Sequence, residues 1–148
     1  MPPPLDPQLA TRFAAVLDTL LPAHPNGGVA AAGSLGIGPE VWERCGPSGW
    51  ADGLAALDAF SRAQTGQAFA DLPGAEREAV LRGFDAADPG ALGGLVFHTY
   101  AVYYQEPRVM EALGLEGRAP FPKGYALETG DLSGLEAVRA RGPRYREI

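Results

Sequence analysis

The side chains that could act in catalysis or bind a metal are few and lie far apart. The chain has two histidines, His24 and His98, and one cysteine, Cys45, none of them at the spacing of a metal-binding motif. A single cysteine also excludes an internal disulfide. We interpret His24, in a proline-flanked loop, as a surface residue and His98, among apolar residues, as a hydrogen-bonded core histidine. We therefore predict no metal site.

Two glycine-containing segments fall short of known functional motifs. Gly33, Gly36 and Gly38 follow the order G-x-x-G-x-G, but no apolar strand precedes them and no lysine follows, so a dinucleotide or phosphate loop is not indicated. Residues 46–50, Gly-Pro-Ser-Gly-Trp, lack the last glycine of the G-x-S-x-G nucleophile elbow. Because nothing assembles a nucleophile, a base and an acid, we predict no catalytic and no cofactor-binding residue.

Composition restricts the partners that the chain can have. Its 148 residues carry a net charge of −6, with 46% hydrophobic and 20% charged residues, which is typical of a globular protein. The negative charge disfavours binding to nucleic acid. The first residues, Met-Pro-Pro-Pro-Leu-Asp-Pro, contain neither the basic nor the apolar part of a secretory signal. We therefore expect a cytoplasmic protein, or a periplasmic one if a leader has been removed.

Apolar residues recur at helical spacing along most of the chain. This pattern predicts helices over residues 7–21, 48–63, 75–85 and 89–105, with shorter ones at 39–45 and 107–113 and a turn at 69–72. Asp6-Pro7 and Asp88-Pro89 are predicted to cap and start two of them. Residues 22–38 are rich in glycine and proline, and we predict a loop there with no helix or strand. The fold class is predicted to be all-α: a small irregular helical bundle with long loops and an extended C-terminal arm.

The segment from Pro89 to Gln105 contains no charged residue and has no polar face. Such a helix is predicted to be buried on all sides, at the centre of the bundle or with one side covered by another protein. It is too short, and too rich in glycine, histidine and tyrosine, to span a membrane. We therefore predict no membrane insertion.

The chain changes character near residue 117. Residues 1–116 carry a net charge of −8 and are predicted to form the helical domain, whereas residues 117–148 carry +2 and contain five glycines and three prolines. We interpret 117–148 as an arm with one helical turn near 132–139. Because it cannot bury its own apolar residues, it is expected to lie on its own domain or to wrap around a partner.

Five segments in a fixed order resemble a known family, over roughly residues 11 to 125. They are Val-Leu-Asp-Thr-Leu-Leu-Pro at 16–22, Gly-Leu-Ala-Ala-Leu-Asp at 53–58, Phe-Ala-Asp-Leu at 69–72, Tyr-Tyr-Gln-Glu-Pro-Arg-Val at 103–109 and Ala-Leu-Gly-Leu-Glu-Gly at 112–117. In this order and spacing, the chain resembles the gluconate 2-dehydrogenase subunit 3 family.

The resemblance implies a small subunit with no cofactor of its own. Its partner would be a flavin-dependent oxidoreductase of the glucose-methanol-choline type, which carries FAD and oxidises a sugar or sugar acid. Members of the family assist folding, flavin loading or export of that partner, and many carry a twin-arginine leader that this sequence lacks. The resemblance transfers no catalytic residue to this chain.

We therefore predict a non-catalytic subunit that stabilises, or assists the maturation of, an FAD-dependent sugar or sugar-acid dehydrogenase or oxidase in a hetero-oligomer. Aromatic residues dominate interface energetics. On that ground the predicted partner-interface residues are Trp42, Trp50, Tyr103, Tyr104, Phe121 and Tyr125. The alternative is a stand-alone small-molecule binding module that uses an aromatic pocket near His98 and Tyr100.

Overall fold

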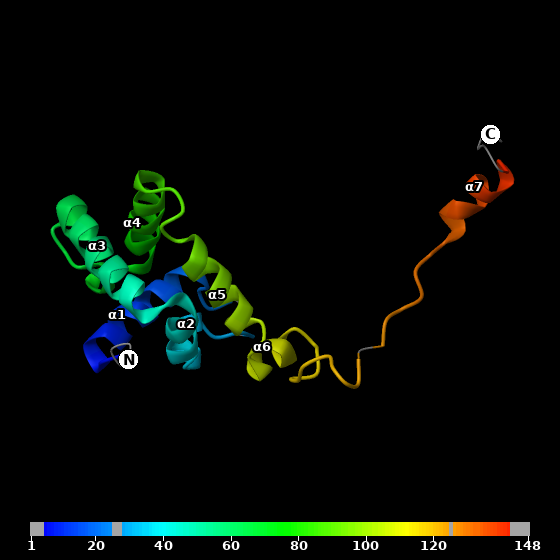
Figure 1. Ribbon diagram of the computed structural model, residues 1–148, viewed down its shortest axis with the longest axis horizontal. Helices are drawn as coiled ribbons and strands as arrows, with labels where there is room; N and C mark the ends of the chain where they lie inside the picture. Colours follow the sequence, from blue (N-terminus) through cyan, green and yellow to red (C-terminus); the bar gives the residue numbers. More distant parts are fainter. Residues whose placement is uncertain (1–4, 25–27, 125, 143–148) are drawn as a thin grey trace. The chain divides into compact units, whose positions relative to one another are not determined.

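The computed structural model describes residues 5–24, 28–124 and 126–142 (Figure 1). The chain divides into two units, Met1–Arg118 and Ala119–Ile148, which are described separately. All regular structure in the described residues is helical, which confirms the predicted all-α fold class.

The described part of the first unit contains six α-helices and two short 3-10 turns. They are α1 Pro7–Leu20, η1 Ala32–Leu35, α2 Gly38–Cys45, α3 Pro47–Thr65, η2 Phe69–Asp71, α4 Gly74–Ala87, α5 Gly93–Tyr103 and α6 Pro107–Ala112. The predicted helices lie at most of these places, with bounds that differ by a few residues.

The two aspartate-proline pairs behave differently. Asp6 caps α1 as predicted: its Oδ1 accepts from the N–H groups of Gln8 and Leu9, both at 2.9 Å. Asp88 instead lies at the C-terminal end of α4, so its predicted role as a helix-starting cap is wrong. A turn follows in which Gly90 has a φ of +100°, a left-handed conformation that interrupts helical geometry. The helix predicted over 89–105 therefore extends only over Gly93–Tyr103.

The core is built around α1, which packs against α2, α3, α4 and both 3-10 turns. Phe13, Val16 and Leu17 on its apolar face are fully buried. The Phe13 ring lies 5.0 Å from the ring of Trp42 and 6.3 Å from that of Trp50, measured between centroids. The central place predicted for the uncharged helix thus belongs to α1, while α5 packs mainly against α2.

The loop between α1 and α2, where no element was predicted, contains η1. This turn lies directly on α1: the Gly33 N–H donates to the Asp18 carboxylate at 2.7 Å, and the Ala32 N–H donates to the Leu21 carbonyl at 3.0 Å. Ala32 and Leu35 are buried there. A four-residue turn has no periodicity that a sequence pattern could reveal.

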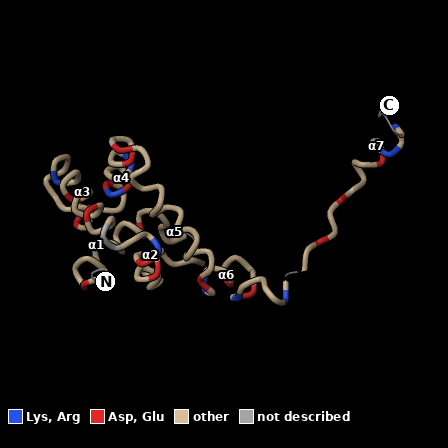
Figure 2. The backbone as a smooth tube through the Cα atoms, viewed as in Figure 1, with Lys and Arg blue, Asp and Glu red and all other residues tan. Residues whose placement is uncertain are grey.

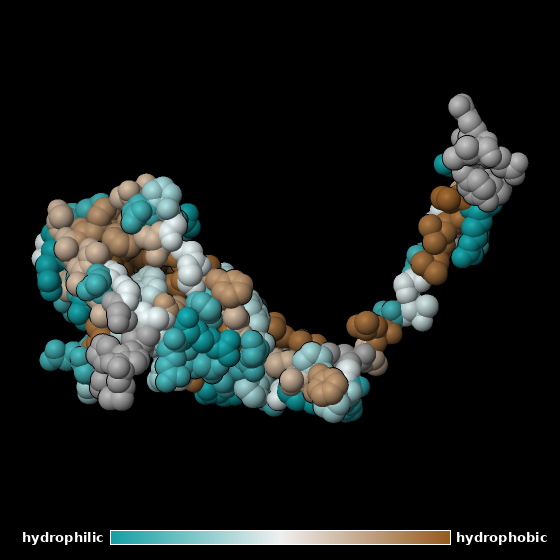
Figure 3. Space-filling model, viewed as in Figure 1, coloured by the Kyte–Doolittle hydropathy of each residue, from teal (hydrophilic) through white to brown (hydrophobic). Residues whose placement is uncertain are grey.

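In the second unit, the described residues form one short helical segment, η3 Ser133–Leu135 followed by α7 Glu136–Ala140, near the predicted turn. Leu132, Leu135 and Val138 are exposed. Brown hydrophobic atoms and teal hydrophilic atoms lie on opposite sides of this segment in Figure 3. Across the described ranges of both units, no helix combines the length and apolarity needed to cross a bilayer.

Candidate functional site

Three of the six predicted interface residues lie in the core. Trp42, Trp50 and Tyr103 are 2%, 8% and 6% exposed. The two indole rings pack around Phe13, and the Tyr103 hydroxyl donates to the Ala30 carbonyl at 3.4 Å. The expectation that these three side chains are available as surface anchors is therefore wrong. Their large rings fill the space between helices, which stabilises the bundle itself.

The other three predicted residues have different outcomes. Tyr104 follows α5 and is 47% exposed, and Phe121, in the second unit, is 86% exposed. Tyr125 lies outside the described residues. The Tyr104 ring packs edge-on against Tyr103 at 5.2 Å between centroids. Burial raises the pKa of Tyr103, and the neighbouring Tyr104 raises it further.

Helix α5 carries an exposed aromatic stripe. Leu95, Thr99 and Val102 are buried on one side of the helix. On the other side lie Phe97, Tyr100 and Tyr104, which are 68%, 43% and 47% exposed; we call these three residues the aromatic face of α5. The rings of Tyr100 and Tyr104 are 5.9 Å apart between centroids.

The first of the two arrangements predicted for this helix, a place at the centre of the bundle, is therefore wrong, whereas the second, with one side covered by another protein, stays a prediction. Within the first unit, α5 packs mainly against α2, and Phe97 and Tyr100 lie on a side of α5 that stays exposed. The exposure of Phe97 and Tyr100 could not be predicted from the sequence, because neither side of the helix carries a charged residue. Periodicity cannot distinguish a core side from an exposed side when polarity does not alternate.

The predicted aromatic pocket near His98 and Tyr100 does not correspond to a groove that we find on the described residues. The best-formed grooves are lined by other side chains. His98 is partly exposed, and its ring packs edge-on against Phe97 at 5.2 Å between centroids. These grooves therefore give no support to the stand-alone binding module.

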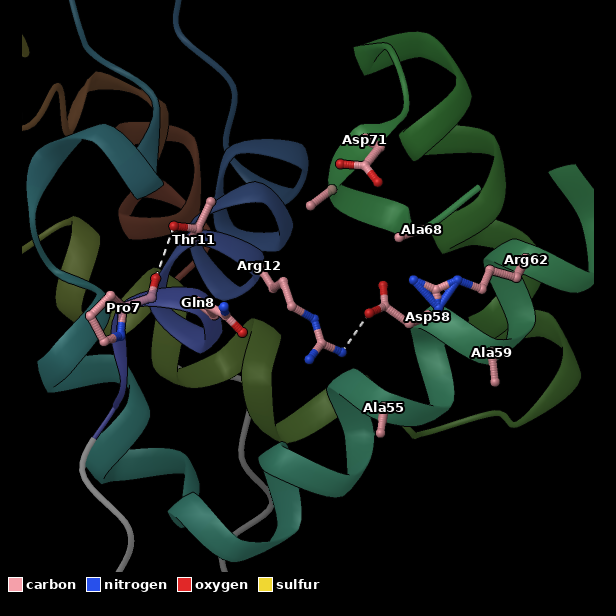
Figure 4. Close-up of a pocket in the computed structure, with 11 residues that line it drawn as sticks. Pro7, Gln8, Thr11, Arg12, Ala55, Asp58, Ala59, Arg62, Ala68 and Asp71 are labelled. Atoms are coloured by element: carbon pink, nitrogen blue, oxygen red, sulfur yellow. Dashed lines mark hydrogen bonds and ion pairs between the residues drawn. The ribbon is translucent and has the colours of Figure 1, made fainter. Parts of the chain in front are cut away.

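A groove on the described residues lies between α1, α3 and η2, with a volume of about 1030 Å³ (Figure 4). Its polar lining includes Arg12 from α1, Asp58 and Arg62 from α3, and Asp71 from η2. In Figure 4 the Arg12 side chain extends from α1 toward Asp58 on the facing helix. Positive and negative side chains are thus equally represented among these four residues, so the groove favours neither an anion nor a cation.

The Arg12–Asp58 ion pair in this groove connects three elements. Arg12 Nη2 lies 2.5 Å from Asp58 Oδ2 and also donates to the Leu54 carbonyl at 3.1 Å. The second oxygen of Asp58 accepts from the backbone N–H of Phe69 at 3.1 Å, which fixes η2 on α3. Since both carboxylate oxygens are engaged, we assign the pair a structural role rather than a catalytic one.

The remaining candidate side chains form no reactive centre in the described ranges. Cys45 is partly buried, and burial raises the pKa of its thiol to about 11. The thiol is therefore protonated near neutral pH, and thiols react and bind metals as thiolates. No group of three or more histidine, cysteine, aspartate or glutamate side chains in the described ranges is placed to hold a metal ion.

Comparison with known proteins gives one clear relationship. The family model for gluconate 2-dehydrogenase subunit 3 matches residues 8–113, which extend from the second residue of α1 to the end of α6 and include the aromatic face of α5. No curated protein and no solved structure matches the chain. Since the family match covers well over half of the sequence, the chain belongs to the gluconate 2-dehydrogenase subunit 3 family.

Proposed function

We propose that this chain is a non-catalytic small subunit that binds and stabilises, or assists the maturation of, an FAD-dependent sugar or sugar-acid dehydrogenase or oxidase. The observation that carries the proposal is the match of residues 8–113 to a family of dehydrogenase subunits. In this proposal the flavin, the sugar site and the electron transfer all belong to the partner chain.

The second unit supports a subunit role. Phe121 and Leu127 are 86% and 89% exposed, and Leu132 is 58% exposed. Each large apolar side chain that becomes fully buried stabilises an association by about 1.5–3 kcal/mol. A segment with several such side chains on its surface is suited to packing on a larger partner, as in interfaces of permanent complexes.

Co-expression with a flavoprotein dehydrogenase encoded near this chain tests the proposal. With the chain present, we expect more soluble flavoprotein, a higher FAD content per polypeptide and higher turnover of a sugar or sugar acid. The readouts are the visible flavin absorbance and dye reduction by the purified partner. Equal yield, flavin content and turnover with and without this chain would contradict the proposal.

Removal of residues 119–148 is expected to weaken the complex by roughly tenfold or more, because the apolar side chains of the second unit no longer contact the partner. Thermal melting of the truncated chain should stay close to that of the full chain, since the buried core belongs to the first unit. Size-exclusion chromatography and a binding titration with the flavoprotein measure the effect. An unchanged dissociation constant would show that residues 119–148 do not contribute to binding of the flavoprotein.

A further inference from the structure

We propose that the aromatic face of α5, formed by Phe97, Tyr100 and Tyr104, is the surface on which this chain docks to the catalytic dehydrogenase subunit. This inference rests on the proposed function and adds to it a location and a chemistry for the interface. None of these three side chains is needed to fill the core, since they are 68%, 43% and 47% exposed.

The geometry of α5 separates a core side from a docking side. Leu95, Thr99 and Val102 are at most 3% exposed and face the bundle. Phe97, Tyr100 and Tyr104 are spaced by three and four residues, which places them along one stripe of the helix. Three neighbouring aromatic rings on one stripe form the kind of anchor cluster that dominates binding energy in protein interfaces.

Charge distinguishes this stripe from the other exposed helix surfaces of the same unit. The outer side of α2 carries Glu40, Glu43 and Arg44, and the outer side of α4 is also charged. The tube of α5 is tan in Figure 2, whereas α2 and α4 carry red or blue segments. From Pro89 to Gln105 the chain has no charged residue. A partner that covers the aromatic face therefore does not have to remove any charged side chain of α5 from water. Covering a charged helix surface would carry that desolvation cost, which is large.

The lack of charge also restricts the class of macromolecule that can bind the aromatic face. Nucleic acids and anionic membranes require cationic side chains, and the aromatic face has none. A protein surface that is mostly apolar can pack against the three rings, and hydrogen-bond acceptors on it can bind the hydroxyls of Tyr100 and Tyr104. Membership of a family of dehydrogenase subunits favours the catalytic subunit as that protein rather than a second copy of this chain.

The C-terminal end of α5 is held in place by contacts within the first unit. Arg108, at the start of α6, donates to the Leu35 carbonyl of η1 at 2.6 Å and pairs with Glu106 at 2.5 Å. Tyr103 at the end of α5 bonds to Ala30 in the same loop. These contacts order the helix before binding, which reduces the conformational entropy lost when a partner docks.

The test is a binding titration between the flavoprotein and the full chain carrying Phe97→Ser, Tyr100→Ser and Tyr104→Ser together. We expect the dissociation constant to rise at least roughly 30-fold, as for the loss of a single strong aromatic anchor. Circular dichroism should show an unchanged helical content, because all three side chains are exposed. The matched control replaces Glu40, Glu43 and Arg44 on α2 with serine, and it should bind like the wild-type chain.

The outcomes separate this inference from the proposed function. If the wild-type chain binds no flavoprotein, the proposed function fails and the docking surface with it. If the wild-type and the aromatic variant bind equally well, the subunit role stands and the docking surface is overturned. If the isolated chain sediments as a dimer that the aromatic variant dissociates while flavoprotein binding is unchanged, the occupant is a second copy and the inference is likewise overturned.

Site-specific crosslinking tests the same surface even if the triple variant does not fold. A photoreactive phenylalanine analogue at position 97 should crosslink to the flavoprotein, since the ring that it replaces is 68% exposed. The same analogue at position 40 on α2 should not. Crosslinking from position 40 and not from position 97 would overturn the assignment.

Discussion

Replacing Gly33 with alanine is expected to destabilise the chain by about 3 kcal/mol or more. A Cβ atom at this position would lie 2.4 Å from the backbone oxygen of Ala14 and 2.8 Å from Asp18 Oδ1. Because backbone of α1 cannot move aside cheaply, η1 would have to shift, and overpacking of this kind costs about 1–3 kcal/mol. The shift would also weaken the 2.7 Å bond from the Gly33 N–H to Asp18, which contributes about 1.5–3 kcal/mol as a bond to a charged group.

Thermal melting followed by circular dichroism measures this loss. A destabilisation of this size should lower the midpoint by about 10 °C in a chain of this length. The control is Gly28→Ala in the same loop, where an added Cβ would meet no atom within 4 Å. A Gly33→Ala midpoint equal to that of the control would contradict the close packing of η1 on α1.

The second large effect is expected for Asp58→Ala, with a destabilisation of about 2–4 kcal/mol. The substitution removes the partner of Arg12 and the acceptor for the Phe69 N–H in one step. The Asp58 side chain is only 14% exposed, so the carboxylate is shielded from solvent more than in a surface pair. Loss of one partner leaves Arg12 in a partly buried position without its counter-ion, which is costly.

Urea unfolding of two variants tests whether the stability depends on the ion pair of Asp58 or only on the presence of an acidic side chain in the groove. Asp71→Ala is the matched control, because Asp71 lines the same groove and has no ion pair among the described residues; its free energy of unfolding should change by less than about 0.5 kcal/mol. If Asp58→Ala also left the free energy of unfolding unchanged, the structural role assigned to the Arg12–Asp58 ion pair would be contradicted.

Much of the fold could be predicted because it depends on local sequence signals. The helices α1, α3 and α4 have amphipathic spacing, and Asp6 caps α1 through neighbouring residues. The segments that resemble the family could also be recognised in the sequence, but the contacts that their side chains make could not be predicted. Asp58 and Asp18 bond backbone groups 11 and 15 residues away, and Arg108 bonds one 73 residues away. Contacts of this range depend on the tertiary fold, which no local pattern encodes.

The interface residues were harder to predict for a related reason. Trp42, Trp50 and Tyr103 are as aromatic as Tyr104, yet the first three fill the core. Aromatic side chains are favoured both in cores and at interfaces, so residue type alone does not separate the two locations. The distinction depends on which side of each helix faces the core, and that is known only once the helices are packed.

The placement of the two tryptophans gives the chain a selective optical reporter. Both indoles lie in the core against Phe13, and neither belongs to the aromatic face of α5 or to the second unit. When tryptophan is excited selectively, the fluorescence of the isolated chain therefore reports on the integrity of the bundle, because neither indole lies on the aromatic face of α5. The folding of a variant can thus be recorded on the isolated chain before its docking is measured.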